Sequence, residues 1–177
     1  MWKELTTKFI VVIFLFAMIF PSANALEISA FETEEDGDAT ISFCKTLKIE
    51  NVSLNKDSVI QTVIFEKDDG EFENIALLNG VIATKIISCF EGVCDTRTSC
   101  NHVPYTLVSA RKVIDRDLVV AKVNFDGDLS AIFLISSYQK KNKTLYRVTS
   151  PQDLKFLNSK YKKNLRNWLI EEAKKIL

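Results

Sequence analysis

The feature that most constrains the fold is an internal repeat in the chain after residue 25. Each half carries alternating apolar and polar runs separated by Asp-Gly turns, and then one helical pattern. Three short stretches recur in the same order in both halves, and such self-similarity predicts a duplicated unit. The matching stretches are 26–30 with 106–110, 39–43 with 120–125, and Leu78-Asn79 with Leu157-Asn158.

The patterns predict an α+β protein built from two tandem repeats, each an antiparallel β-meander of about four to five strands followed by a C-terminal helix. A stretch rich in Gly, Asp, Thr, Ser and Asn, at residues 91–104, predicts a cysteine-containing linker between residues 26–90 and 105–177. The expected strands are 27–33, 39–44, 47–54, 59–65, 72–77, 105–113, 118–125, 129–138 and 144–149, and the expected helices are 81–90 and from about residue 158 to the end.

The first 25 residues resemble a secretory signal peptide. Lys3 and Lys8 precede an apolar run at residues 9–20, and Ala23-Asn24-Ala25 supplies a small-x-small cleavage site. The run is shorter than the ~20 apolar residues that span a bilayer. We therefore expect cleavage after Ala25, no stable membrane span in the mature chain, and a periplasmic or extracellular location; an uncleaved anchor is the alternative.

The charge balance argues against nucleic acid as the partner. The full chain has formal net charge +0, and removal of Lys3, Lys8 and Glu4 would leave it near −1. Nucleic-acid binding depends on neutralising phosphates with an excess of basic residues.

Four cysteines, all after the expected cleavage site, predict two disulfides in an exported chain. Four cysteines allow three pairings; we favour Cys94–Cys100 within the linker and Cys44–Cys89 between a strand and a helix. A zinc site formed by Cys89, Cys94, Cys100 and His102 is an alternative, although its spacing lacks the usual Cys-x-x-Cys knuckle. Free thiols are a third possibility.

The stretch Asp69-Gly70-Glu71-Phe72-Glu73-Asn74-Ile75 is expected to form a turn and a strand, and Leu78-Asn79 with Lys85-Ile86 lies at the expected start of the first helix. In these stretches the chain resembles the SpoVG family of septation proteins, whose members carry an Asp-Gly-Glu-Phe turn and strand followed by an Ile-Asn helix start. The N-terminal strand and turn, and the start of the second helix, also fit. The further matching residues are Glu27-Ile28, Asp36-Gly37 and Leu157-Asn158-Ser159.

The resemblance covers most of residues 26–177 and implies the family's fold. Because family members form homodimers, it also implies a monomer that packs as an intramolecular pseudo-dimer. The family's role in nucleic-acid binding would place the contact at a Ser-Lys-Arg segment, but here residues 65–69 are acidic. Fold therefore transfers more readily than activity.

The one basic cluster lies in a turn of the second half and is formed by Lys140, Lys141, Lys143 and Arg147, with Tyr138 and Tyr146 beside it. With the basic final helix it predicts contact with an anionic partner, either a protein or a polymer. A solvated turn is the plainer explanation.

No pattern points to catalysis, a metal or a cofactor. The acidic residues at 34–36, 68–69 and 126–128 lie at expected turns, and His102 is the only histidine. We therefore expect a non-enzymatic, exported binding module. The alternatives are a nucleic-acid-binding regulator that uses the basic face of the second repeat, and a thiol enzyme that uses the linker cysteines.

Overall fold

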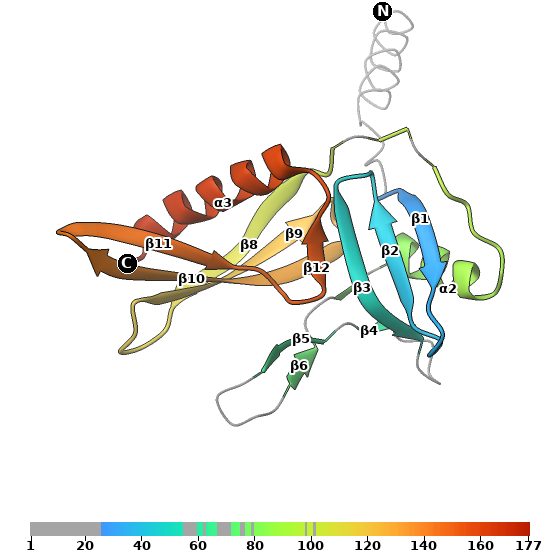
Figure 1. Ribbon diagram of the computed structural model, residues 1–177, viewed down its shortest axis with the longest axis horizontal. Coiled ribbons are helices and arrows are strands. Elements are labelled where there is room, and N and C mark those ends of the chain that lie inside the picture. The colour runs from blue at the N-terminus through green and yellow to red at the C-terminus, as the bar shows by residue number, and fades with distance from the viewer. Residues whose placement is uncertain are drawn as a thin grey trace, which may run out of the picture.

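The computed structural model shows an α+β protein with two antiparallel sheets that lie side by side, each with one helix (Figure 1). It describes residues 26–54, 60–61, 63–66, 72–74, 77–78, 80–97, 99–100 and 102–177. The expected signal peptide, residues 55–59 and residues 67–71 lie outside the described residues. Neither described helix is both long and apolar enough to cross a membrane.

The first sheet is a meander of β1, β2 and β3, in which alternate residues are buried. Alternation buries Ala39, Ile41 and Phe43, whereas the residues between them are partly exposed. Phe31 of β1 pairs with Ile41, and its ring lies 5.1 Å from that of Phe90 of α2, so this buried face points toward α2. Two short strands share the far edge of β3: β12 pairs with one end and β4 with the other. The elements are β1 (Ile28–Thr33), β2 (Ala39–Phe43), β3 (Leu47–Leu54), β4 (Ile60–Gln61), α2 (Gly80–Phe90) and β12 (Leu154–Phe156).

The second sheet follows the same plan with longer strands, in the order β11-β10-β9-β8. Helix α3 covers one face, where Leu165 and Leu169 pack toward Phe133 of β10. The elements are β7 (Leu77–Leu78), β8 (Tyr105–Lys112), β9 (Leu118–Phe125), β10 (Leu129–Lys140), β11 (Lys143–Thr149) and α3 (Ser159–Lys174); β5 (Val63–Glu66) and β6 (Phe72–Asn74) form a separate two-stranded hairpin.

Each sheet receives one short strand from the other half of the chain. Strand β12, just before α3, pairs antiparallel with the start of β3, so that Phe156 lies opposite Leu47. Strand β7, just before α2, pairs antiparallel with the start of β10, so that Leu78 lies opposite Leu129. The two exchanges occupy the same place relative to their helices, and they join the halves through backbone hydrogen bonds.

The second turns of the two meanders are alike. Thr46 N donates to the carbonyl of Phe43 at 2.9 Å, and Asp128 N donates to that of Phe125 at 3.2 Å. Both turns use left-handed backbone at their first two residues, with φ of 48° and 51° in Cys44-Lys45 and 53° and 81° in Asp126-Gly127. Near the turns, Ile28 pairs with Phe43 as Tyr105 pairs with Phe125.

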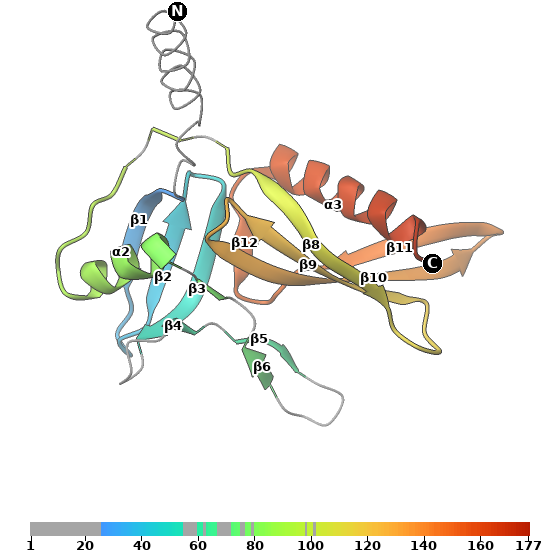
Figure 2. The ribbon, with the colours of Figure 1, turned by 180° about the vertical axis from the view of Figure 1, so that it is seen from behind.

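A single cluster of buried side chains runs through both halves. Tyr161 of α3 belongs to this cluster and is 5 % exposed, and its hydroxyl donates to the carbonyl of Val103 at 2.8 Å. Trp168 is partly buried with its ring centroid 5.0 Å from that of Tyr105, so this residue belongs to the packing between α3 and β8. Seen from behind, the linker leaves α2 and passes around the outside of the first sheet to reach β8 (Figure 2).

Candidate binding surface

The basic residues singled out in the sequence gather at the end of the β10–β11 hairpin. Lys140 and Lys143 are directly opposite in the ladder, and Lys141-Asn142 form the two-residue turn with φ of 50° and 58°. Positive φ at both central residues matches the right-handed twist of a hairpin. The hairpin reaches one end of the molecule's long axis, well away from the first sheet (Figure 1).

The three lysines are exposed, and among the described residues none of them forms an ion pair. Like charges directly opposite on neighbouring strands destabilise a hairpin. An anion bound at the tip would relieve the repulsion between Lys140 and Lys143. Arg147 lies on the same face as these two, opposite Ser136.

Helix α3 adds cations along the other face of the hairpin. Arg166 donates from its guanidinium to the carbonyl of Tyr146 at 3.2 Å, and Lys174 lies 5.7 Å from the centre of the Tyr146 ring. Lys174 and Lys175 are also paired with Glu171 and Glu172, so this end of α3 is charge-balanced. The hairpin tip, unlike the C-terminal end of α3, therefore carries exposed positive charge without an ion pair among the described residues. The first turns of α3 do so as well, at Lys160, Lys162 and Lys163.

A small cavity lies between α3 and the sheet. It has a volume of about 40 Å³. Its lining combines the cations Lys162 and Arg166 with apolar residues that include Phe133, Val148 and Leu165. Small-molecule sites usually measure about 300–1,000 Å³. This cavity has room for a water molecule or one small group, but not for a larger ligand.

The cysteine pairing expected from the sequence is wrong. The structure joins Cys44 to Cys100 with an S–S distance of 2.09 Å, and Cys89 to Cys94 with 1.97 Å. The chain reverses after α2: Gly92 has φ 87°, and Val93 N donates to the carbonyl of Ser88 at 2.8 Å. This turn brings Cys94 back beside Cys89.

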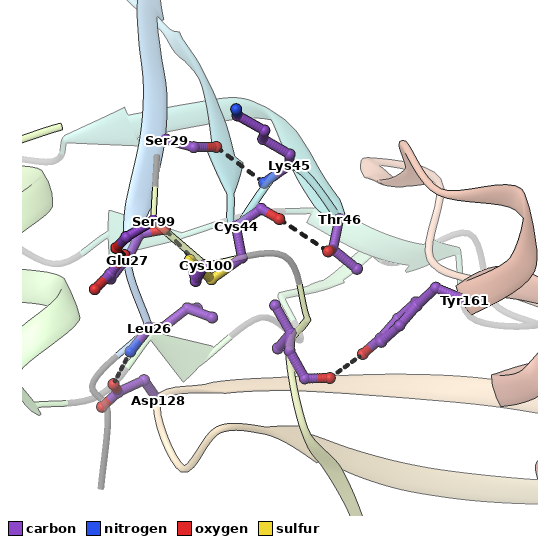
Figure 3. The surroundings of a disulfide bond; sticks show 11 residues. Leu26, Glu27, Ser29, Cys44, Lys45, Thr46, Ser99, Cys100, Asp128 and Tyr161 are labelled. Atoms are coloured by element: carbon purple, nitrogen blue, oxygen red, sulfur yellow. Dashed lines mark hydrogen bonds between the residues drawn. A yellow bond between two sulfur atoms is a disulfide. The ribbon is translucent and has the colours of Figure 1, made fainter. Parts of the chain in front are cut away.

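The linker then runs along β1, and Cys100 is bonded to Cys44 in the β2–β3 turn (Figure 3). Arg97 N donates to the carbonyl of Ile28 at 2.8 Å, and the Ser99 hydroxyl donates to Glu27 at 2.7 Å. On the opposite side of β1's start, Leu26 N donates to Asp128 at 3.2 Å. The Cys44–Cys100 disulfide therefore fixes the linker at the junction of the two halves.

His102 is exposed, and its ring lies 5.6 Å from that of Tyr161. The zinc alternative used Cys89, Cys94 and Cys100 as ligands, but all three are disulfide-bonded. A nucleophilic thiol next to His102 also needs a reduced cysteine. In the part of the chain that the structure describes, no cysteine is free and no three candidate metal ligands cluster.

The acidic residues at 34–36 lie in a turn and accept hydrogen bonds within it. Asp36 accepts from Asp38 N at 3.1 Å, and Glu34 accepts from the Thr40 hydroxyl at 2.8 Å. Burial raises the pKa of Asp38, and the nearby charges of Asp36 and Glu34 raise it further. The stretch at 68–69 lies outside the described residues.

Sequence reasoning missed two cations on the face of the second sheet that points away from α3. Lys122 of β9 and Arg111 of β8 face away from α3, next to half-buried aliphatic residues. The strands 118–125 and 129–138 give a partial indication of this face, because aliphatic side chains occur in both sets of alternate residues and not only in the set that faces the core. The sequence does not say which set α3 covers.

No family model, curated protein sequence or solved structure matches this chain.

Proposed function

We propose that the chain is a non-enzymatic binding protein of an oxidising compartment outside the cytoplasm, and that its β10–β11 hairpin contacts an anionic partner. The observation that carries the proposal is the exposed hairpin tip, where Lys140, Lys141 and Lys143 gather without an ion pair among the described residues. The two disulfides support the compartment, because disulfides persist where thiols are not kept reduced.

We further propose that the chain is a tandem SpoVG-like protein in which the two repeats pack as an intramolecular pseudo-dimer. The reciprocal pairings of β12 with β3 and of β7 with β10 support this organisation. The matching turns at Phe43–Thr46 and Phe125–Asp128 support it as well. In the observed ladders Ile28 and Tyr105 occupy equivalent positions, because each pairs with the last residue of the next strand, Phe43 or Phe125. The sequence comparison of 26–30 with 106–110 instead aligns Ile28 with Val108.

The test compares two charge-matched variants of the exported protein. Lys140→Gln with Lys143→Gln removes two charges at the hairpin tip, and Lys45→Gln with Lys85→Gln removes two from the first half. The probes are polyglutamate, inorganic polyphosphate and a single-stranded oligonucleotide, measured at low and at near-physiological salt. Surface-charge attraction is screened within about 8 Å at about 0.15 M salt, so binding should weaken as salt rises.

We expect the hairpin variant to bind polyglutamate or polyphosphate several-fold more weakly, and the first-half variant to bind like the wild type. Equal loss in both variants would show that only overall charge matters. Absence of binding to every probe at low salt would refute the proposal. Preference for the oligonucleotide, with a steep salt dependence, would instead support the nucleic-acid alternative.

A further inference from the structure

The second sheet has one face that no described helix covers. Within β10, Phe133 and Ile135 face α3, so the alternate residues Ile132, Leu134 and Ser136 point to the opposite face. Cross-strand partners share a face, and the ladder registers therefore place residues of all four strands on this surface. We call it the outer face of the second sheet.

An aliphatic stripe crosses the middle of the outer face. Val120 of β9 lies directly opposite Leu134 of β10, and both are partly exposed and lie outside the buried core cluster. The stripe continues toward the hairpin tip, where Tyr138 lies opposite Leu145. The exposed fractions of these two residues are 49 % and 37 %.

Positive charge frames the stripe. Lys122 lies opposite Ile132, Arg111 lies opposite Val120, and Lys140 and Lys143 close the far end. Along the strands, this face carries no carboxylate in the part of the chain that is described. Carboxylates lie in the turns at the strand ends: Asp115 and Asp117 between β8 and β9, and Asp126 and Asp128 between β9 and β10. Of these, Asp117 lies 3.9 Å from Lys112.

The first sheet supplies an internal comparison. The corresponding face of its strands carries Ser42 opposite Lys48, and Lys48 pairs with Glu50 at 2.7 Å. Lys155 of β12 lies 3.5 Å from the same Glu50. That face is polar and charge-balanced, as a solvent-facing sheet face usually is. The fold therefore does not require the aliphatic stripe or the unbalanced cations of the outer face.

We propose that the outer face of the second sheet docks an acidic, amphipathic polypeptide segment of a partner protein. The aliphatic side of the segment would cover Val120 and Leu134, and its carboxylates would meet Lys122, Lys140 and Lys143. This inference deepens the proposed function, on which it rests, by naming the partner's chemistry. It adds apolar burial to charge, and apolar burial is the larger source of affinity at interfaces.

Two other occupants fit less well. A second copy of the chain packed face to face would bring the same cations together, and an interface with like charges across it is disfavoured. A membrane needs apolar groups that protrude beyond the cations. Here the hairpin tip is Lys140-Lys141-Asn142-Lys143, and the aliphatic stripe lies behind it in the sheet.

The test uses three synthetic peptides of equal length and the full exported chain. One peptide alternates Glu with Leu, a second replaces Leu by Ser, and a third replaces Glu by Lys. Anionic phosphatidylglycerol vesicles test the membrane. The variant Val120→Thr with Leu134→Thr removes apolar surface while it keeps good strand formers, and Val120→Ile is its conservative control.

We expect the Glu-Leu peptide to bind at least about tenfold more tightly than the Glu-Ser and Lys-Leu peptides, and the double Thr variant to lose that advantage. Lys122→Glu should weaken Glu-Leu binding, whereas Lys122→Arg should not, and this pair tests the face without removing aliphatic residues. Circular dichroism and thermal unfolding identify any variant that fails to fold.

Equal binding of the Glu-Leu and Glu-Ser peptides would overturn this inference and leave the proposed hairpin function standing. Tighter binding to vesicles than to every peptide would show that the occupant is a membrane. Failure of all acidic probes would remove both proposals together. Dimerisation of the free chain that the double Thr variant abolishes would assign the face to a second copy.

Discussion

At the scale of single residues, the contact that joins α3 to the linker is the hydroxyl of Tyr161. It donates to the carbonyl of Val103, two residues before the start of β8, and both residues are buried. Burial raises the pKa of Tyr161, and nearby Tyr105 contributes to the shift. One polar contact therefore ties the last helix to the segment that carries Cys100.

Tyr161→Phe should lower the free energy of unfolding near neutral pH by about 1–2 kcal/mol, because the carbonyl of Val103 would lose its buried donor. The wild type should also lose stability as the pH rises above about 10, the usual pKa of tyrosine. There the unfolded chain releases the phenolic proton while the folded protein keeps it, which favours unfolding.

Urea unfolding between about pH 7 and pH 11 measures both effects. The Phe variant should show a shallower decline above about pH 10, and Tyr138→Phe, at an exposed site, should match the wild type. An unchanged stability of the Phe variant near neutral pH would contradict the role of this hydrogen bond.

Residue identity predicted the presence of two disulfides but not their partners. The number of cysteines and their place after the predicted export signal point to oxidation. The pairing depends on the path of the backbone between the cysteines. Two features set this path: the left-handed turn at Gly92 and the course of the linker beside β1. Neither feature leaves a periodic signal in the sequence.

At the scale of elements, the strands with strong alternation were predicted closely. Residues 47–54 and 118–125 match β3 and β9 at both ends, and the first helix was expected one residue short of the observed start at Gly80. Strand β12 was missed altogether, because three residues form no pattern and its partner β3 is about a hundred residues away in sequence. The expected strand 72–77 is observed as β6 and β7, and β7 pairs outside its own half.

The two disulfides should differ in their effect on stability. Cys44–Cys100 spans 56 residues, and Cys89–Cys94 spans 5. The loop-entropy model gives about 4 kcal/mol for the longer loop and about 2 kcal/mol for the shorter one. Replacing both cysteines of a pair by alanine should therefore destabilise the protein more for Cys44 and Cys100.

Chemical unfolding of the two double-alanine variants, each compared with the oxidised wild type, checks this order. Mass spectrometry after alkylation without reductant first confirms that the remaining pair is intact. A larger loss for the Cys89 and Cys94 variant would mean that the short disulfide holds the end of α2 by a mechanism other than chain entropy.

At the scale of the whole molecule, the sequence predicted two similar halves and one linker. It did not predict that each half lends a strand to the other. Local patterns report which residues are strands, whereas the choice of β3 and β10 as partners depends on the fold already being formed. The same limit hid the outer face of the second sheet, since only the position of α3 shows which aliphatic set is left uncovered.

The pairing of β7 with β10 and of β12 with β3 predicts the result of cleaving the chain within the linker. A specific protease site inserted after Asp95, in the exposed stretch of the linker, would separate residues 26–95 from the rest. Because Cys100 lies beyond the cut, the Cys44–Cys100 disulfide should hold the two pieces together until reductant is added. A single band on a non-reducing gel, and two bands on a reducing gel, would show this.

The decisive version of the experiment removes that disulfide by Cys44→Ala and Cys100→Ala before the cut. Two lent strands and one shared core cluster should keep the nicked halves associated in native mass spectrometry, with a fold similar to that of the uncut variant. Neither half expressed alone should fold as a monomer, because each would leave the edge of its third strand and part of its core uncovered. A stable, monomeric first half would mean that the lent strands are peripheral, and it would argue against the pseudo-dimer.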